Sequence, residues 1–443
     1  MLAKVKALLP VRIRRRIVIH INKLPVELLA EIFLWCNPIG TFPRPSRHLA
    51  PILLGRVCRV WRSVSLSTPQ LWAQIVINIE YEEGNSRPQN SWNSRLFDEW
   101  LRRSGHCPLS FTIGRHYPVY HAPLTLKLHA EAHRWKTVSL ETDCNYCIDD
   151  ILRLLWIPGT TPMLTDLRFL HQSPFDIGIP IPVTIASQII SFHVVLPINS
   201  FSPNGGYHAL RELRIGPCVT TQQYSLVFTQ FPLLEILEIA AAFPLRENAK
   251  VVHTLQHLHT FIFVGDGLVA ELWLLDLFDA PALHSLAISI DIYCGGEFQE
   301  WDRLSNFLVR CGGQLRRLML KGNFICHELV ELTRHTPILV SLCVEITTLI
   351  GDLTTLCPKL SQVDILDGHG DVMTAVSAIL SRWEAGRLKE RRSAVSPFGI
   401  RVPPRRLLEV LKLQNVKWCI QQGLRVGPLP SKDDFWWKSH ILI

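Results

Sequence analysis

The chain has 443 residues, more than one compact core usually occupies, so its length predicts either several domains or an elongated repeat. With 48% hydrophobic and 19% charged residues, it is too apolar for a largely disordered chain. The formal net charge of +8 is modest and the basic residues gather at the two ends, which argues against a nucleic-acid-binding protein.

The first 22 residues form a basic leader. Arg14, Arg15 and Arg16 lie in it and no long apolar core follows, so no secretory signal is predicted. The leader contains no acidic residue, which leaves a mitochondrial signal open as an alternative. Twelve cysteines without a regular framework favour reduced thiols, and therefore a cytoplasmic or nuclear protein.

Residues 24–36 carry apolar side chains at helical spacing, which predicts a short amphipathic helix. Pro25 suits the first turn, and the negative charge of Glu27 complements the helix dipole there. Asn37 and Pro38 end this helix.

A second amphipathic segment is predicted over residues 54–66, with its arginines on one side and its apolar residues on the other. Ser67 and Thr68 then precede Pro69, which predicts a capped short helix that reaches Trp72. Helices of this size bury little surface by themselves, so their apolar faces need a partner or the following domain.

The strings LPVELLAEIF and LLGRVCRVWRSVSLSTPQLW, separated by a loop longer than the minimal motif, resemble an F-box of the form common in fungal proteins. The resemblance covers Lys23 to Ile75 and implies docking on the Skp adaptor of a cullin-RING ubiquitin ligase. At each matching position taken singly, a plain core residue is the alternative. The positions to which the resemblance assigns the docking contact are Leu24, Pro25, Leu28, Ile32, Val57, Cys58 and Trp61.

Residues 77–160 are predicted to be a linker with degenerate first repeats. A helix near Trp100 is expected to end in a glycine cap at Gly105. Degenerate strands are expected at residues 109–113 and 135–140. Residues 177–209 lack Asp, Glu, Lys and Arg, but several prolines interrupt them, so a buried strand with its loops is favoured over a transmembrane segment.

An apolar pattern with residues at the first, fourth and sixth positions recurs nine times in residues 161–385. Successive copies start 21 to 25 residues apart, apart from one step of 32 residues that contains Gly295 and Gly296. This period is typical of leucine-rich repeats, in which each unit is a strand, a crossing and a helix. One such helix is expected at residues 268–278. The copies begin at Leu164, Ile189, Leu210, Leu234, Leu258, Leu283, Leu315, Leu339 and Leu360.

The predicted fold is therefore α/β. A short helical F-box precedes an irregular leucine-rich-repeat solenoid, with parallel strands on its concave face and helices on its convex face. The expected divisions are a leader at 1–22, the F-box at 23–76, the linker at 77–160, the solenoid at 161–385, and a basic C-terminal tail or cap at 386–443.

Residues between the apolar positions of each strand are expected to point into the concavity. No basic cluster dominates them, so we expect a mixed or apolar groove for a protein target rather than a phosphate-binding arginine nest. The equally weighted alternative is that the C-terminal tail covers the apolar positions. The predicted target contacts are Ile236, Glu238, Ile262, Val264, Arg317 and Lys321.

The sequence contains no coherent catalytic constellation, and no metal or cofactor is predicted. His129, His133, Cys144 and Cys147 have ligand-like spacing, but the order is reversed from a Cys-first zinc finger and chance spacing is favoured. Basic residues between 387 and 406 fit a solvated linker better than a nuclear signal.

The sequence thus predicts a non-catalytic adaptor. The F-box would bind a Skp-type adaptor and, through it, a cullin, while the repeats would hold an unidentified target protein. Two rivals stay open: a repeat scaffold that never assembles a ligase, and a hydrolase or metal enzyme hidden in the repeat region.

Overall fold

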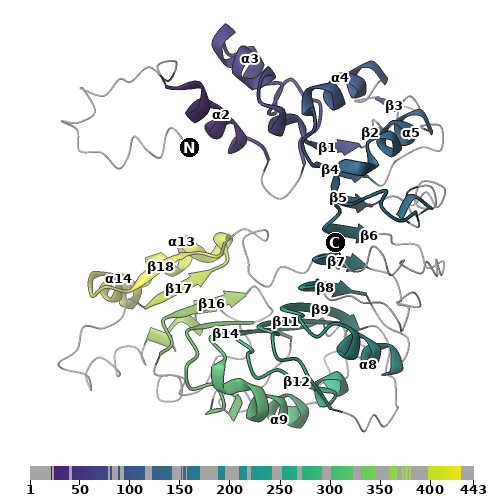
Figure 1. The fold of residues 1–443 in the computed structure, drawn as a ribbon. Helices are drawn as coiled ribbons and strands as arrows, with labels where there is room; N and C mark the ends of the chain where they lie inside the picture. Colours follow the sequence, from purple (N-terminus) through teal and green to yellow (C-terminus); the bar gives the residue numbers. More distant parts are fainter. Residues whose placement is uncertain are drawn as a thin grey trace. The chain divides into compact units, whose positions relative to one another are not determined.

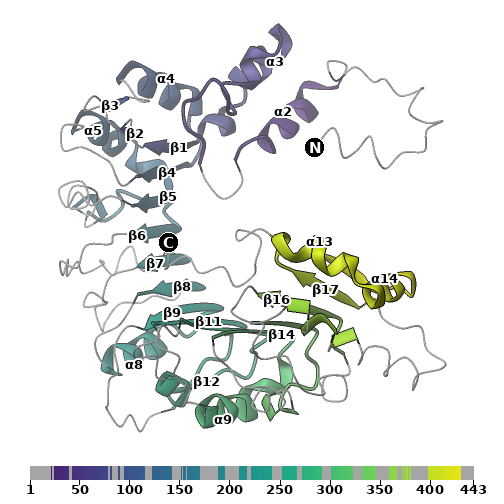
Figure 2. The same ribbon diagram turned by 180° about the vertical axis from the view of Figure 1, so that it is seen from behind.

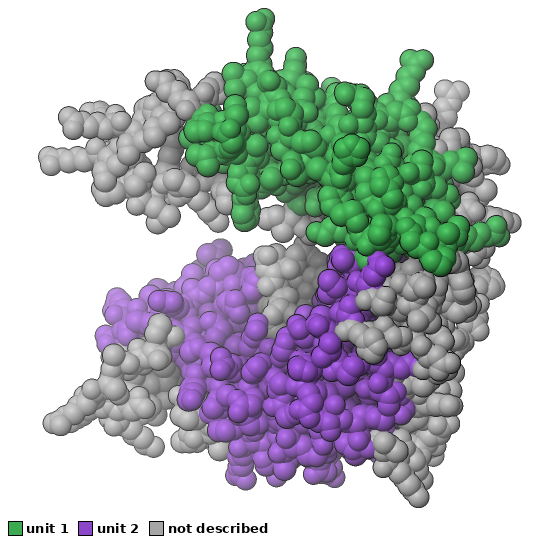
Figure 3. Space-filling model, viewed as in Figure 1, with its two compact units in different colours: residues 1–164 green, residues 165–443 purple. Residues whose placement is uncertain are grey.

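The structure is a computed structural model, and it falls into two compact units, Met1–Leu164 and Thr165–Ile443 (Figure 3). Each unit is described by itself. The described residues are 21, 24–38, 42–77, 80–81, 88–89, 94–114, 122–141, 151–169, 188–194, 209–216, 221–241, 252–266, 272–291, 301–322, 331–345, 359–366, 372–380 and 398–430, without 152, 156, 333, 374 and 378.

The first unit begins with a helical module. Its elements are α2 (Val26–Leu34), η2 (Leu54–Arg56), α3 (Arg59–Leu66) and η3 (Pro69–Trp72). The helix predicted over residues 24–36 is confirmed as α2, and Pro69 starts η3 as expected. The second amphipathic segment is not continuous, because Cys58 takes an extended backbone and caps α3.

A parallel ladder follows in the first unit. It consists of β1 (Gln74–Ile77), β4 (Leu109–Ile113) and β5 (Trp135–Leu140), in that order. The two degenerate strands expected from the sequence are confirmed as β4 and β5. The remaining elements are β2 (Glu80–Tyr81), β3 (Pro88–Gln89), α4 (Ser94–Ser104), α5 (Ala122–Ala130) and η5 (Ala132–Arg134).

Gly105 ends α4 with a φ of +55°, a conformation that glycine adopts without the steric cost of a side chain. The helix expected near Trp100 is therefore confirmed together with its cap.

The second unit contains a parallel sheet of strands that stack one after another (Figures 1 and 2). All nine repeat copies form strands in this sheet, so the predicted positions are confirmed. These strands are β6 (Asp166–Phe169), β7 (Ser191–Val194), β8 (Glu212–Ile215), β9 (Ile236–Ala241), β11 (Thr260–Asp266), β13 (Ser285–Asp291), β14 (Arg317–Lys321), β15 (Ser341–Glu345) and β16 (Gln362–Leu366).

The register keeps equivalent residues of the repeats in line. Leu237 pairs with Phe261, which pairs with Leu286, and Leu286 pairs with Leu318. All four are buried. This line of large apolar residues is the core that the stacked strands share.

Crossings in the second unit include α8 (Thr221–Gln230) and α9 (Trp301–Cys311), which lie on the outer side of its sheet in both views (Figures 1 and 2). The 32-residue step between two copies of the pattern contains α9, and its Gly295 and Gly296 lie outside the described residues. Shorter elements are β10 (His253–Thr254), η6 (Leu272–Asp276), β12 (Phe278–Asp279) and η7 (Gly312–Gln314).

The α-helix expected over residues 268–278 is wrong for the part that the structure describes. Leu272–Asp276 forms a 3₁₀ helix, and Phe278 enters a strand. The reason is the pairing of Phe278 with His253 in a small parallel ladder, which takes the end of the segment out of the helical conformation.

Beyond the predicted repeats, two further strands extend the sheet. The C-terminal elements are β17 (Gly399–Val402), α13 (Pro404–Lys412), α14 (Gln414–Gln421) and β18 (Arg425–Pro428). Both strands pair in parallel with their predecessors, so this part of residues 386–443 is a folded cap. Arg401, expected in a solvated linker, forms an ion pair with Asp364.

The stretch at 177–209 contains β7, and its remaining residues are largely outside the described part of the chain. Among the helices that the structure describes, none combines the length and the apolar character needed to cross a membrane.

Candidate functional site

Helix α2 has one buried and one exposed apolar side. Leu29 and Phe33 are buried, whereas Leu28 is 54% exposed and Ile32 is 39% exposed. The ring of Phe33 lies 4.8 Å from that of Trp61, which joins α2 to α3. The buried side of α2 therefore holds the module together, and its other side faces solvent as protein-binding surfaces do.

The turn before α3 presents a second exposed apolar residue. Val57 is 55% exposed. The backbone N–H of Trp61 donates to Cys58 Sγ at 3.4 Å, and Arg62 Nε donates to the Gly55 carbonyl oxygen at 2.7 Å. These two bonds fix the path of the chain around Val57 and so hold it at the surface.

None of the seven residues predicted to contact the Skp adaptor is buried. Pro25, Leu28, Ile32 and Val57 are exposed, and the other three are half-buried. For Cys58 and Trp61 the structure also gives local roles, as a helix cap and as a ring partner of Phe33.

The exposed apolar surface of the helical module is larger than the sequence analysis predicted. Trp35 is 72% exposed and follows Leu28 by seven residues and Ile32 by three, which puts all three on one side of the helix. The same spacing is visible in the sequence, so it could have placed Trp35 on this surface. Other exposed apolar residues of the module are Val26, Leu49, Leu53, Val60 and Leu66.

The second unit offers a different candidate, the side of its sheet opposite α9. The Phe261 ring lies 5.2 Å from Phe278, which lies 5.3 Å from Phe307 of α9. Because successive residues of a strand point to opposite sides, Ile262 lies on the other side of the sheet. We call that side the helix-free face.

One residue from each strand forms a continuous row along this face, and the register aligns them. The row begins with charged and polar residues, continues with apolar ones, and ends in an ion pair. Its members are Arg168, His193, Arg214, Glu238, Ile262, Ala287, Met319, Cys343, Asp364 and Arg401.

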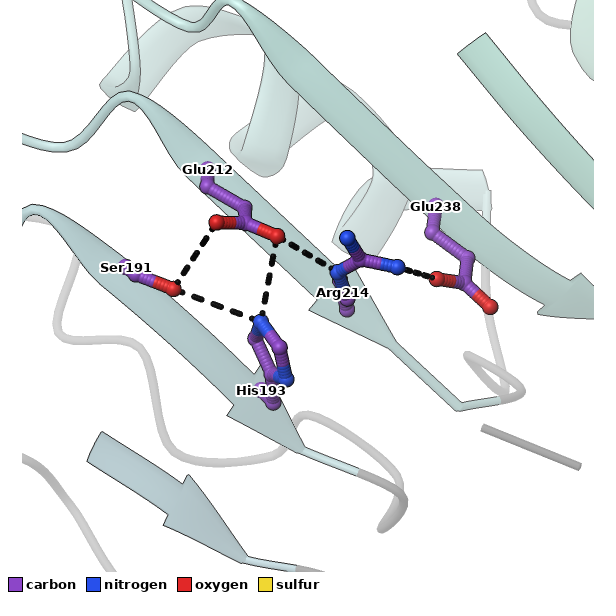
Figure 4. A network of polar contacts seen from close by, with 5 residues as sticks. All are labelled: Ser191, His193, Glu212, Arg214 and Glu238. Carbon is purple, nitrogen blue, oxygen red and sulfur yellow. Dashed lines mark hydrogen bonds and ion pairs between the residues drawn. The ribbon is translucent and has the colours of Figure 1, made fainter. Parts of the chain in front are cut away.

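The charged half of the row forms a polar network (Figure 4). Arg214 links two carboxylates: its Nε donates to Glu212 at 2.6 Å and its Nη1 to Glu238 at 2.5 Å. Glu212 also accepts a hydrogen bond from Ser191 Oγ at 3.1 Å, and His193 Nε2 lies 3.3 Å from Glu212 Oε1. Glu238 is completely buried, so this ion pair neutralises a charge inside the protein.

Ser191, His193 and Glu212 do not have the arrangement of a catalytic triad. Ser191 Oγ lies 3.3 Å from His193 Nε2, and Glu212 contacts the same nitrogen. A triad requires the acid on the opposite ring nitrogen, where it orients the imidazole for the serine. Ser191 and His193 are also buried, which fits a structural network.

Burial and neighbouring charges shift both titrating groups of this network. Burial lowers the pKa of His193 and is the largest cause; the hydrogen bond to Glu212 opposes it, and the charges of Arg214 and Arg168 add to the lowering. Burial alone raises the pKa of Glu212, but the His193 hydrogen bond and the Arg214 charge hold it well below its usual range. At neutral pH, His193 is therefore neutral and Glu212 ionised.

The apolar half of the row is buried. Ile262, Ala287, Met319 and Cys343 are each at most 1% exposed, and they form one cluster with Val264 and Leu366. Side chains on a sheet face in contact with water would be partly exposed, so other residues cover this part of the face. Leu429, which follows β18, packs against the cluster.

The six predicted target contacts fall into different environments. Glu238 is paired with Arg214, and Ile262 and Val264 are buried. Arg317 is exposed, and Ile236 and Lys321 are half-buried. Because Ile262 and Val264 are buried in this conformation, a target can contact them only after the residues that cover them have moved.

The zinc-like spacing is only partly within the described chain. His129 lies in α5, with its ring 6.4 Å from Trp135, and His133 lies in η5. Cys144 and Cys147 lie outside the described residues. Within the described ranges, no group of three or more His, Cys, Asp or Glu residues could hold a metal ion.

Comparison with protein-family models and with curated proteins finds no match to this chain.

Proposed function

We propose that this protein is the substrate-recognition adaptor of a cullin-RING ubiquitin ligase. The helical module acts as an F-box that binds a Skp-type adaptor. The second unit acts as an irregular leucine-rich-repeat solenoid that holds a target protein, so the chain itself performs no chemistry. Tethering raises the local concentration of the target's lysines near the charged ubiquitin-conjugating enzyme.

One observation carries the proposal. Leu28, Ile32 and Val57 were selected from the F-box resemblance, and all three are more than a third exposed although they are large and apolar. Their neighbours Leu29 and Phe33 are buried, so the helix already has a core without them. Large apolar residues that a fold does not use internally are typical of a protein-binding surface.

The solenoid part of the proposal rests on the repeat. Nine strands follow one another at the period of leucine-rich repeats and pair in parallel with equivalent residues in line. The absence of the usual asparagine after most strands makes the repeat irregular. A solenoid of this kind offers an extended surface for a protein target.

The test uses the full-length chain co-expressed with a Skp-type adaptor. We expect the two proteins to co-elute, and a double substitution of Leu28→Asp and Ile32→Asp to abolish co-elution, because two charges cannot be desolvated at an apolar interface. The matched control is Val309→Asp with Leu408→Asp, two apolar residues that are 61% and 72% exposed in α9 and α13.

Loss of binding in the first variant but not in the control supports the adaptor. A folded wild-type chain that does not bind, or a Leu28/Ile32 variant that still binds, refutes it. Adding the cullin separates the adaptor from the alternative scaffold: a complex with Skp that never recruits cullin favours the scaffold.

A further inference from the structure

The residues that directly precede five neighbouring strands of the second unit, β8, β9, β11, β13 and β14, form a second row at the edge where these strands begin. Backbone hydrogen bonds join them one after another: the Glu235 N–H donates to the Arg211 carbonyl oxygen at 2.7 Å, and the His259 N–H donates to that of Glu235 at 3.0 Å. In the same way, His284 donates to His259 at 3.0 Å and Arg316 to His284 at 2.9 Å. Successive members therefore lie one strand spacing apart, about 4.8 Å. We call the five residues the edge row: Arg211, Glu235, His259, His284 and Arg316.

The first three members of the edge row already form ion pairs. Arg211 Nε lies 3.4 Å from Glu235 Oε1, and His259 Nε2 lies 3.7 Å from Glu235 Oε2. The three side chains are 37% to 42% exposed, so these pairs lie at the surface. Glu235 shows that a carboxylate at this edge fits between the nitrogen-bearing side chains of the two neighbouring strands.

Positive charge gathers at the other end of the edge row. The rings of His259 and His284 stack with their centroids 6.3 Å apart. Among the residues that the structure describes, Arg316 makes no ion pair, and its side chain is exposed. Burial lowers the pKa of His284, and the charges of Arg316, His259 and Arg317 lower it further. The gap between His284 and Arg316 thus lacks the carboxylate that Glu235 supplies two strands away.

The chain segments that lead into the last three strands add no negative charge. They contain no Asp or Glu, and they are residues 255–259, 280–284 and 312–316. His257, in the first of them, is exposed. Asp279, which directly precedes the second, pairs with Arg310 at 2.6 Å. An acidic group for this part of the edge therefore has to come from a partner.

We propose that this edge of the sheet binds an acidic segment of the target protein, with one carboxylate held between His284 and Arg316. The inference rests on the proposed role of the second unit in holding a target, and it names the chemistry of that target. A protein segment is favoured over a nucleic acid, because Glu235 in the same row repels a chain of phosphates. Surface pairs of this kind contribute up to about 1 kcal/mol each, so the edge selects acidic targets and does not supply the whole affinity.

The test measures the binding of a probe peptide to the full-length chain by fluorescence anisotropy. The probe is a fluorescein-labelled peptide of eight residues in which glutamate alternates with glycine, and the same peptide with glutamine is the uncharged control. Low ionic strength is used, because salt screens exposed charges. We expect the glutamate peptide to bind and the glutamine peptide not to bind.

Charge reversal in the edge row tests where the peptide binds. Arg316→Glu should weaken binding of the glutamate peptide at least about fivefold, because it replaces an attraction by a repulsion. Lys412→Glu, at an exposed lysine of α13, changes the net charge by the same amount and should bind as the wild type does. Arg316→Lys, which keeps the charge, should stay within about twofold of the wild type.

A wild-type chain that does not bind the glutamate peptide, or equal weakening by Lys412→Glu, overturns the proposal. So does an oligothymidylate of eight nucleotides that binds at the same edge as tightly as the peptide. Co-elution with the Skp-type adaptor keeps the two proposals apart, and Arg316→Glu should leave it unchanged. A chain that binds the peptide but no adaptor keeps the acidic-segment site and loses the ligase role, whereas a chain that binds only the adaptor loses the site alone.

Discussion

The helical module of the first unit and the helix-free face of the second both present large apolar side chains, but in opposite states. Leu28 and Trp35 face solvent, more than half exposed. Ile262 and Cys343, on the side of the sheet opposite α9, are at most 1% exposed. Similar apolar side chains are therefore exposed on the first surface and buried on the second.

This difference has a functional consequence. A vacant apolar surface binds whenever its partner is present, because burial of the surface is all that the interaction requires. An occupied surface binds only in competition with its cover, so its apparent affinity falls by the fraction of time that it is covered. On the proposed function, the exposed side of α2 can therefore bind the Skp-type adaptor without a rearrangement, whereas a target can reach the apolar cluster only after one.

The polar network beside the covered cluster gives the largest expected effect. Replacing Arg214 by alanine leaves Glu238 completely buried without that cation, which we expect to lower the free energy of unfolding by about 3–5 kcal/mol. Urea denaturation of the purified variant measures it.

The matched control is Arg211→Ala, which removes a surface pair with Glu235 at 3.4 Å and should cost less than about 1 kcal/mol. A double replacement of Arg214 by methionine and Glu238 by leucine should recover most of the loss, since the completely buried carboxylate is removed; the remainder reflects Glu212, which also loses Arg214. If Arg214→Ala is as mild as the control, the network contributes nothing to stability.

Because Leu28 is exposed and Ile262 is buried, similar truncations of the two should lower the free energy of unfolding by different amounts. Ile262→Ala should destabilise the chain by about 2–5 kcal/mol, because it opens a cavity in a packed cluster. Leu28→Ala should change the stability by no more than about 0.5 kcal/mol, because its side chain contacts mainly water. Thermal unfolding followed by circular dichroism compares the two.

Leu29→Ala, one residue away in the same helix but buried, is the internal reference and should resemble the costly substitution. Equal costs for Leu28 and Leu29 would show that the exposed side of α2 is packed in solution, against the interpretation of a vacant surface.

Much of the fold was predictable because every strand of the repeat buries apolar side chains at the same positions. Leu286 and Ile288 face the shared core at the same positions as Leu318 and Leu320, and a pattern that recurs nine times is visible without a structure. β17 was missed because, in the register that pairs Ile400 with Val363, Pro397 stands at the first apolar position of the pattern.

For the two candidate sites, the sequence predicted on which side of its helix or strand a residue lies, but not how far the residue is buried. Helical spacing assigned Leu28 and Ile32 to one side of α2, since neighbours in a helix follow from the sequence alone. Alternation also assigned Ile262 to the helix-free face. Whether it is buried stayed open between a free groove and cover by the C-terminal tail, because packing of a distant residue such as Leu429 against the cluster leaves no local pattern in the sequence.

The smallest expected effect concerns pH and again involves the polar network. The pKa of His193 is lowered below its ordinary value of 6.5, so this residue binds a proton more tightly in the unfolded chain than in the folded chain. Stability from this residue is therefore complete above pH 6.5 and is lost as the pH falls below it. From about pH 7.5 to about pH 5.5, the loss should reach at most about 1.4 kcal/mol. Further loss follows below the ordinary pKa of Glu212, 4.5, because that pKa is lowered too.

Urea denaturation at the two pH values measures this slope. His193→Gln should flatten it, since the residue no longer titrates; some slope remains because burial also lowers the pKa of His253 and His284. His257→Gln removes an exposed histidine and is the matched control. An unchanged slope in the His193 variant would mean that the residue binds its proton equally well in the folded and the unfolded chain, which would contradict the shift that burial of its imidazole causes.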